Sequence, residues 1–319
     1  MASGSSARRL RLSILSVFDP WNSPLCYCPI KYSLNPYTGC SFECIYCYAT
    51  SYIGVKPSTP KKAASLRLER DIAKIPPGSI INIGTSSDPY PEVEENIGVT
   101  RRILERLIPE GFRILITTKG TLYAWRDLDL IASGNVAVTP TITGLDSNEV
   151  LRIVESGAPS QGERLSAARE ASRAGVPIAV RIDPIIPYVN DDPHEIRELV
   201  SIVADLGARM IITSTFKARR DSLARIRRVM GPEGESIYRL YTRRGVWVHG
   251  YLYLPRDDRE ALLEPVVSEA RKLGLEYATC REGLSGPEWF KAGSCDGSHL
   301  IPMRIRPRSG LAEWMEREA

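Results

Sequence analysis

The feature that most constrains the fold is an alternation of short apolar runs with longer amphipathic stretches between residues 79 and 215. Each apolar run is rich in β-branched residues and is bounded by glycine or proline, as buried strands are. The predicted strands are 79–84, 112–117, 135–139, 177–182 and 208–213. Because parallel strands need long crossover connections, this rhythm predicts right-handed βαβ units and a parallel sheet.

The segments that connect these strands are predicted to be helices. The helical stretches are 97–107, 162–174 and 193–206, and the last begins with Asp192 as N-cap and Pro193 in the first turn. A strand near 34–38 brings the number of repeats to about six, whereas a closed TIM barrel has eight. We therefore expect an α/β fold built on a partial (βα)6 TIM-like barrel.

The barrel is expected to occupy residues 34–215, with a segment at each end. Residues 1–33 precede it, and residues 216–319 form a C-terminal α/β extension. Within the extension, 217–230 and 257–273 are predicted helices, 246–253 is a predicted strand, and the remainder is predicted to be rich in loops. We expect the extension to bind substrate or to cover the mouth of the barrel.

The composition favours a cytoplasmic protein without a membrane anchor. No apolar run approaches the roughly 20 residues of a membrane helix, and the N-terminus lacks the apolar core of a secretion signal. The net charge of +4 permits a polyanionic partner without requiring one. Seven cysteines, an odd number, argue against a disulfide scaffold and favour metal binding or catalysis.

Three of these cysteines share one loop. Cys40, Cys44 and Cys47 have the spacing C-x-x-x-C-x-x-C and follow the first predicted strand. Thiolates are the usual ligands of iron–sulfur clusters, which normally take four. Three local thiols leave one iron open to an outside ligand, much as a catalytic zinc keeps an open position. A structural zinc loop is the alternative, but zinc sites usually draw four ligands from two paired motifs.

This loop resembles the signature of the radical S-adenosylmethionine superfamily. The resemblance implies that Cys40, Cys44 and Cys47 hold a [4Fe–4S] cluster whose open iron binds S-adenosylmethionine. An electron from an external one-electron reductant, ferredoxin-like or flavodoxin-like, would then cleave the cofactor. The 5′-deoxyadenosyl radical so formed would abstract hydrogen from a substrate, with the protein positioning the reactants and excluding water.

More specifically, residues 34–190 resemble the spore photoproduct lyase-like branch. The shared elements are Asn35-Pro36-Tyr37-Thr38-Gly39-Cys40, Ser87-Asp88-Pro89-Tyr90, Thr117-Thr118-Lys119 and Arg181-Ile182-Asp183-Pro184. Ligands of parallel α/β sheets bind at the carboxyl ends of strands, where these elements fall. The resemblance implies a cofactor-binding set of Tyr48, Ser86, Ser87, Asp88, Lys119, Thr141 and Arg181.

The resemblance breaks at the hydrogen donor. The lyase has a cysteine just ahead of its Ser-Asp pair, and this chain has Thr85, whose O–H bond is too strong for that role. The radical-relay tyrosine of the family is present as Tyr46. Splitting of thymine dimers is therefore not expected, and Cys280 is one candidate for a replacement donor.

The four cysteines outside the loop leave several alternatives open. Cys26, Cys28, Cys280 and Cys295 could together bind zinc or a second iron–sulfur cluster. They could also be inert buried thiols, or two of them could form a disulfide.

The substrate is not specified by these motifs. The start of the extension is rich in basic residues, with aromatic residues between them. This pattern is typical of a nucleic-acid-binding surface, and equally of a solvent-exposed helix. These residues are Phe216, Lys217, Arg219, Arg220, Arg225, Arg227, Arg228, Tyr238, Tyr241, Arg243, Arg244 and Trp247. The first hypothesis is thus hydrogen abstraction from nucleic acid or a nucleotide, in DNA repair or modification. The alternatives are a peptide, protein or metabolite substrate, or an iron–sulfur electron carrier or nucleic-acid-binding protein without radical chemistry.

Overall fold

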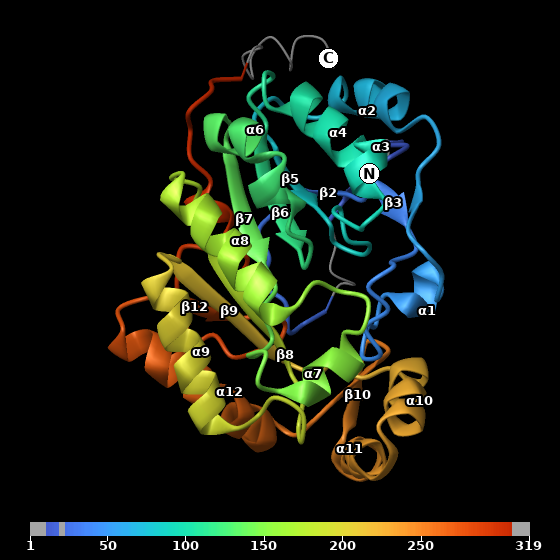
Figure 1. Ribbon diagram of the computed structural model, residues 1–319, viewed down its shortest axis with the longest axis vertical. Coiled ribbons are helices and arrows are strands. Elements are labelled where there is room, and N and C mark those ends of the chain that lie inside the picture. Colours follow the sequence, from blue (N-terminus) through green and yellow to red (C-terminus); the bar gives the residue numbers. More distant parts are fainter. Residues whose placement is uncertain (1–10, 19–22, 308–319) are drawn as a thin grey trace, which may run out of the picture.

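A computed structural model describes residues 11–18 and 23–307. Its centre is a curved sheet in two hydrogen-bonded parts (Figure 1). The first part has the order β1 (Leu15–Val17), β2 (Tyr32–Leu34), β5 (Ile80–Ile83), β6 (Arg113–Thr118), β7 (Val136–Pro140). The second has the order β8 (Ala179–Ile185), β9 (Met210–Thr215), β12 (Glu276–Thr279), β13 (Phe290–Lys291).

Two isolated parallel bridges join these parts into one sheet. Val138 pairs with Ile178, and Thr141 pairs with Arg181, so β7 continues into β8. All neighbours from β2 to β12 run parallel, whereas β1 and β13 pair antiparallel at the two edges. The strands do not close on themselves in the described residues, so the expected partial TIM-like barrel is confirmed.

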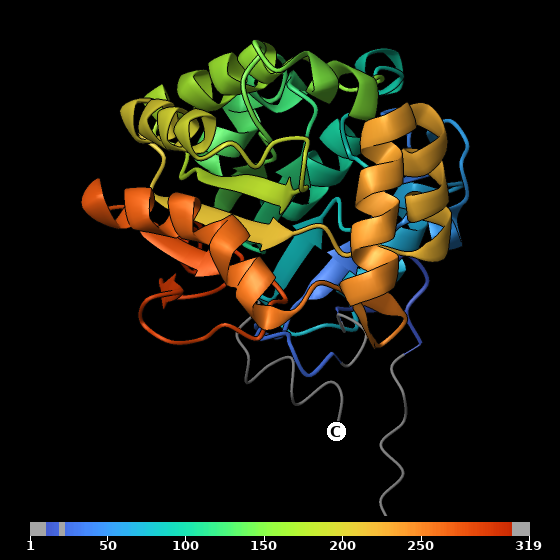
Figure 2. The ribbon, with the colours of Figure 1, turned by 90° about the horizontal axis from the view of Figure 1, so that it is seen from below.

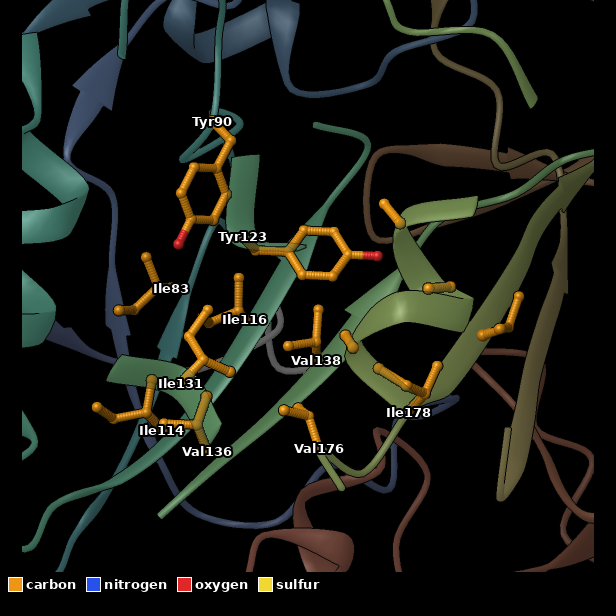
Figure 3. Close-up of a cluster of buried hydrophobic side chains, with 14 of the residues drawn as sticks. Ile83, Tyr90, Ile114, Ile116, Tyr123, Ile131, Val136, Val138, Val176 and Ile178 are labelled. Atoms are coloured by element: carbon orange, nitrogen blue, oxygen red, sulfur yellow. The ribbon is translucent and has the colours of Figure 1, made fainter. Parts of the chain in front are cut away.

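The outer face of the sheet packs against helices. Ile114 and Ile116 of β6 and Val136 and Val138 of β7 are buried there, because alternate residues of a strand point to opposite faces. Figure 3 shows these side chains with Ile178, Tyr90 and Tyr123 in the same cluster. The covering helices are α2 (Ala64–Ile72), α3 (Glu94–Ile97), α4 (Val99–Leu107), α5 (Leu122–Trp125), α6 (Leu128–Ser133), α8 (Gln161–Arg173), α9 (Pro193–Asp205) and α12 (Arg256–Lys272).

The inner face is split into two layers along the strands. The lower layer is apolar and contains Leu115, Ala137, Ala179, Ile212 and Ala278. A C-terminal segment fills the barrel beneath them and contributes the buried side chains of Cys295, Leu300 and Ile301, around the 3-10 turn Ser298–Leu300. Two residues further along each strand the inward side chains become polar, as in Ala179 to Arg181, so the barrel is open to ligands at its carboxyl end.

Capping residues mark the starts of two main helices. The Asp192 carboxylate accepts hydrogen bonds from the backbone N–H groups of His194 and Glu195, as its N-cap position predicted. Helix α8 begins with a capping box between Ser160 and Glu163. The remaining short elements are α1 (Thr50–Ile53), α7 (Glu149–Val154) and the pair β3 (Tyr37–Thr38) and β4 (Thr59–Pro60).

The C-terminal part differs from expectation in three places. The predicted helix 217–230 begins only at Arg220, and a second helix follows it, giving α10 (Arg220–Val229) and α11 (Gly231–Arg244). The predicted strand 246–253 is a hairpin of β10 (Val246–Val248) and β11 (Tyr251–Tyr253). Its turn is formed by His249 and Gly250, both with positive φ, as a two-residue hairpin turn needs. Strand β12, predicted as loop, joins the barrel sheet beside β9.

Helices α10 and α11 stand beside the barrel next to α1 (Figure 2). Elsewhere the N-terminal and C-terminal segments meet across the open side of the barrel, where Gly283 N–H donates to the Leu25 carbonyl at 3.3 Å. No helix among the described residues is long and apolar enough to cross a bilayer. The N-terminal residues on which the absence of a secretion signal was predicted lie outside the described part of the chain.

Candidate active site

A cavity of about 250 Å³ lies where the parallel strands end. Every residue that the sequence singled out as catalytic, cofactor-binding or a cluster ligand contributes to its lining. These residues are Cys40, Cys44, Tyr46, Cys47, Tyr48, Ser86, Ser87, Asp88, Lys119, Thr141, Arg181 and Cys280. The structure thus brings the set together, although their individual roles stay predictions.

The cysteine loop is held by its own backbone and by distant segments. Gly39 has φ +74°, and a Cβ there would lie 2.3 Å from the Pro57 carbonyl oxygen, so this close crossing requires glycine. The next residue, Cys40, donates its N–H to the Lys56 carbonyl at 2.9 Å. Ile45 N–H donates to the Val154 carbonyl at 3.0 Å.

Helix α10 also supports this loop. Arg225 donates from its guanidinium to the carbonyls of Ile45 at 3.1 Å and Cys47 at 2.7 Å, and to Thr50 Oγ1 at 2.8 Å. The sequence treated Arg225 as part of a basic surface. The structure corrects this reading, because its charge is directed to the loop and to Asp221.

The donor set of the loop fits an iron–sulfur cluster. Three thiols line one cavity, and burial raises the pKa of Cys40 to about 11 and of Cys44 to about 12, although Lys119 opposes the rise at Cys44. Such desolvated thiols are disfavoured as free anions, and binding a cationic iron centre would offset that cost. The loop contains no fourth cysteine, and the cavity that its three thiols line leaves room for an outside ligand.

The turn after β5 is organised around Asn35. Asn35 Oδ1 accepts hydrogen bonds from the N–H groups of Ser86 at 2.9 Å and Ser87 at 3.3 Å. The Ser87 hydroxyl donates to the Gly39 carbonyl, which ties this turn to the cysteine loop. Asp88 accepts from the backbone N–H groups of Tyr90 at 2.9 Å and Lys119 at 2.7 Å. The hydrogen bonds of Ser87 and Asp88 are therefore made within the chain, whereas Ser86 is bonded more loosely, to Tyr52 at 3.2 Å.

Lys119 and Tyr46 belong to one buried network. The Tyr46 hydroxyl donates to Glu155, and Lys119 Nζ lies 3.8 Å from the same carboxylate and 5.5 Å from the Tyr46 ring centroid. Arg164 completes the network at 2.6 Å from Glu155. Although burial opposes it, these cations lower the pKa of Glu155 to about 2, so the network holds a permanent carboxylate beneath the cysteine loop.

The ends of β8 and β9 carry a second charged group. Arg181 and Asp183 form an ion pair, and both line the cavity. Asp183 also accepts a hydrogen bond from Ser214, and the Arg181 guanidinium interacts electrostatically with Cys280. Thr141 lies between β7 and β8, where its N–H donates to the Thr118 carbonyl at 2.8 Å.

The structure adds cavity residues that the sequence did not single out. Lys217, read as a surface cation, is buried and pairs with Glu282 at 3.0 Å. Arg281 has φ +58°, and its guanidinium carbon lies 4.5 Å from the Tyr251 ring centroid and 5.8 Å from that of Tyr48. The alternation of Tyr277, Ala278, Thr279 and Cys280 could have flagged this strand end, since such alternation is typical of strands.

The outer cysteines also reach this region. Cys28 and Cys280 line the cavity, and Cys295 is buried beneath it, with its Sγ 3.7 Å from Cys28 Sγ. Hydrogen bonds with Cys26 and Cys295, together with nearby Lys31, lower the pKa of Cys28. Thr85 faces the cavity too, but its hydroxyl is bonded to Ser33 and accepts from Asn35 at 3.1 Å.

With this geometry in place, the family can be stated. The model of the radical SAM superfamily matches residues 34–200, and the chain belongs to that superfamily of enzymes. An uncharacterized protein of Mycobacterium tuberculosis is 30% identical over 272 residues, which cover 77% of this chain and 76% of that protein. An uncharacterized protein of Methanocaldococcus jannaschii is 29% identical over 181 residues, covering 53% of this chain and 65% of that protein.

Solved structures agree in fold. Spore photoproduct lyase complexed with dinucleoside spore photoproduct gives a TM-score of 0.61 at 17% identity, covering 86% of this chain and 79% of that chain. Streptococcus suis SuiB bound to S-adenosylmethionine gives 0.54 at 13% identity, covering 77% of this chain and 49% of that chain. The expected likeness to the spore photoproduct lyase-like branch is therefore confirmed at the level of the fold.

Proposed function

We propose that this enzyme cleaves S-adenosylmethionine reductively at a [4Fe–4S] cluster held by Cys40, Cys44 and Cys47. The observation that carries the proposal is one cavity lined both by these three thiols and by the polar ends of four parallel strands. When bound, the cluster and S-adenosylmethionine supply a 5′-deoxyadenosyl radical that abstracts hydrogen from the substrate. An external one-electron reductant of the ferredoxin or flavodoxin class completes the system.

We divide the surrounding residues into those that contact the cofactor and those that position other parts of the site. We assign cofactor contacts to Tyr48, Ser86, Thr141 and Arg181, whose polar groups line the cavity. Ser87, Asp88 and Lys119 make their polar contacts mainly within the chain, so they position the turn, the strand end and the cysteine loop. Tyr46 donates to Glu155 and would keep the loop oriented while remaining available as a radical relay.

Cys280 is the proposed hydrogen donor that closes the reaction. Thr85 cannot serve, because its O–H bond is too strong and its hydroxyl is already hydrogen-bonded. Cys280 lies on the cavity wall and burial raises its pKa, which keeps it as the S–H form that a hydrogen donor needs. Its electrostatic interaction with Arg181 places the sulfur near an assigned cofactor contact.

Anaerobic reconstitution tests the cleavage. Chain loaded with iron and sulfide, reduced with dithionite and given S-adenosylmethionine should form 5′-deoxyadenosine, quantified by chromatography. Cys47→Ala should lose both the iron and the product, whereas the matched variant Cys280→Ala should keep both. Absence of 5′-deoxyadenosine from fully loaded wild-type protein would contradict the radical assignment and favour an electron carrier.

The iron count also tests the predicted second metal site, since about four irons mean one cluster and about eight mean two.

For the substrate we propose nucleic acid or a nucleotide, on the evidence of the surface beside α1. Two adjoining grooves of about 920 and 650 Å³ share Arg220 and Trp247, and the smaller one also includes Thr50 and Ser51. Trp247 is 49% exposed, and the Arg220 guanidinium lies 5.6 Å from its ring centroid. Exposed aromatic rings among arginines suit stacked bases and phosphates.

Salt-dependent binding tests this substrate class. Binding of fluorescent single-stranded DNA or RNA should weaken with added salt, and Gln at Arg219, Arg220, Arg227 and Arg228 should reduce the logarithmic slope by roughly 3. Gln at Arg256 and Lys272, both exposed on α12, should leave it unchanged. An unchanged slope in the first variant would favour a peptide or metabolite substrate instead.

A further inference from the structure

The buried carboxylate of Glu155 is surrounded by donors on both of its oxygen atoms. Oε1 accepts hydrogen bonds from the Tyr46 hydroxyl and from Thr143 Oγ1, the latter at 2.9 Å. Oε2 accepts a hydrogen bond from Gln161 Nε2 at 3.1 Å and pairs with the buried guanidinium of Arg164 at 2.6 Å. Each of these contacts favours the charged form, so the carboxylate stays ionised.

Lys119 brings a second cation to the same carboxylate. Its Nζ lies 3.8 Å from Glu155 Oε1. Although burial opposes it, this carboxylate helps to raise the pKa of Lys119 above its ordinary value, so the ammonium keeps its charge. We refer to Lys119, Arg164 and Glu155 as the charge group. Two cations and one anion leave one positive charge in excess within it.

The charge group lies beside the cysteine loop. Tyr46, which donates to Glu155, is placed between Cys44 and Cys47 in the chain. Lys119 Nζ is 5.5 Å from the ring centroid of Tyr46. Lys119 lines the same cavity as the loop thiols and interacts electrostatically with Cys44 and Cys47. The excess positive charge is therefore next to the thiols that would carry the negative charge of a bound cluster.

A second buried lysine on the cavity wall provides a comparison. Lys217 pairs with Glu282 at 3.0 Å, and Glu282 also pairs with Arg259 at 2.8 Å. This group has the same composition of two cations and one carboxylate. Its main electrostatic partners lie outside the cysteine loop, among them Cys280. Position, and not composition, therefore distinguishes Lys119 from Lys217.

We propose that the charge group sets the reduction potential of the cluster held by the three loop cysteines, and that its excess positive charge raises this potential. The inference rests on the proposed function for the presence of the cluster. Reduction transfers one electron from the external carrier and so adds one negative charge to the site. A nearby positive charge stabilises the added negative charge, and net charge is one of the properties by which proteins set cluster potentials.

A redox titration followed by electron paramagnetic resonance tests this role. Reconstituted full-length proteins are compared without S-adenosylmethionine, because a lysine that only contacts that cofactor would leave the potential unchanged. At the wild-type midpoint potential, Lys119→Met should lower the ratio of reduced to oxidised cluster about tenfold, a shift of roughly 59 mV for a one-electron couple. This variant keeps the ion pair between Glu155 and Arg164, so it should fold and load iron.

Charge reversal and charge balance separate electrostatics from damage to the fold. Glu155→Gln leaves two cations, so its midpoint should move in the opposite direction. The double variant Lys119→Met/Glu155→Gln again has one excess cation, so its midpoint should return close to that of the wild type. Lys217→Met is the matched control, and its midpoint should equal that of the wild type. Asp88, the other carboxylate that interacts with Lys119, is the same in all of these proteins.

Several results would overturn the role of the charge group. One is a wild-type midpoint in Lys119→Met, and another is an equal shift in Lys217→Met. A double variant displaced as far as Lys119→Met would also overturn it, because the loss would then follow structure and not charge. If Glu155→Gln fails to load iron, Lys119→Met and Lys217→Met still decide.

The proposed cleavage can fail separately. Wild-type protein that is loaded with iron but forms no 5′-deoxyadenosine contradicts the radical assignment, while the midpoints still decide the role of the charge group. Wild-type protein that takes up no iron and sulfide contradicts both.

Discussion

At the scale of single residues, the loop that presents the cysteines depends on the absence of a side chain at Gly39. Gly39→Ala would meet the Pro57 carbonyl at 2.3 Å and would also occupy φ +74°. The positive φ alone costs about 1–3 kcal/mol, and the clash forces the loop from its path. We expect iron loading to fall to a small fraction of wild type, measured by colorimetric iron assay after reconstitution.

Gly54→Ala provides the matched control for this substitution. It shares the positive φ, at +78°, but a Cβ there has no atom closer than 3.9 Å. Its melting temperature should therefore fall, while its iron loading stays near wild type. Equally low iron loading in the two variants would show that backbone strain, and not the crossing at Pro57, decides the shape of the loop.

The residues of the site could largely be predicted from sequence, but their partners could not. Cysteine spacing and strand-end position identified twelve residues from sequence, and all twelve line one cavity. Lys119 is an example, because its sequence context suggested a cofactor contact, which stays a prediction, but gave no sign of its ion pair with Glu155. Lys31 and Asp296 are separated by 265 positions and pair only through the tertiary fold. Local patterns carry no information on such contacts.

At the scale of elements, helix α10 acts as a support for the cysteine loop. Arg225→Met keeps the aliphatic length but removes the donors to Ile45 O, Cys47 O and Thr50 Oγ1. Buried carbonyls left unsatisfied cost about 1–3 kcal/mol. We expect lower iron retention during dialysis against a chelator and a lower melting temperature. Arg228→Met, exposed on the same helix, should behave as wild type.

Strand β1 is attached to α2 through one carboxylate. Asp71 accepts hydrogen bonds from the N–H groups of Ser13, Ile14 and Leu15 at 2.7–2.9 Å. Burial alone would raise the pKa of Asp71, but these donors lower it below its ordinary value. The stabilisation is therefore complete above the carboxyl pKa of the unfolded chain, and it is lost as the pH falls through the lower pKa of the folded chain.

This sign gives a measurable pH dependence. Hydrogen-exchange protection of residues 13–17 should stay constant down to about pH 4, the ordinary carboxyl pKa, and should fall as the pH is lowered from there to about 2. Asp71→Asn has one acceptor oxygen in place of two, so protection should already be low at the higher pH. Protection in the wild type that stays constant over this range would contradict the role of Asp71.

The elements of the barrel were more predictable than those of the extension. Long amphipathic helices and β-branched strands carry a periodic signal, and α9 and β6 lie within one residue of their predicted bounds. Strand β12 is only four residues long, so the alternation of Tyr277, Ala278 and Thr279 is a weaker signal than those of the barrel strands. It becomes a strand because α12 returns the chain beside β9, and that requires the tertiary fold.

At the scale of the whole molecule, the two edges of the open sheet are not joined by strand pairing, so other contacts must connect them. The buried ion pair between Lys31 and Asp296 joins the segment before β2 to the segment after β13, across the open side of the barrel. Lys31 Nζ also lies 4.4 Å from the Phe18 ring centroid. Breaking such a pair from one side leaves a buried charge without a partner, which typically costs about 3–5 kcal/mol.

A double-mutant cycle measures this closure. Lys31→Met and Asp296→Asn should each lower the free energy of unfolding in urea by about 3–5 kcal/mol, whereas the double variant should lose much less than the sum, because neither charge remains unpaired. The surface pair Arg256 and Glu260 offers the matched control, with single substitutions to Gln costing less than about 1 kcal/mol. Additive losses at Lys31 and Asp296 would mean that the two segments are held by their apolar contacts alone. A large coupling energy would mean that the barrel is closed electrostatically, next to the thiols of Cys28 and Cys295.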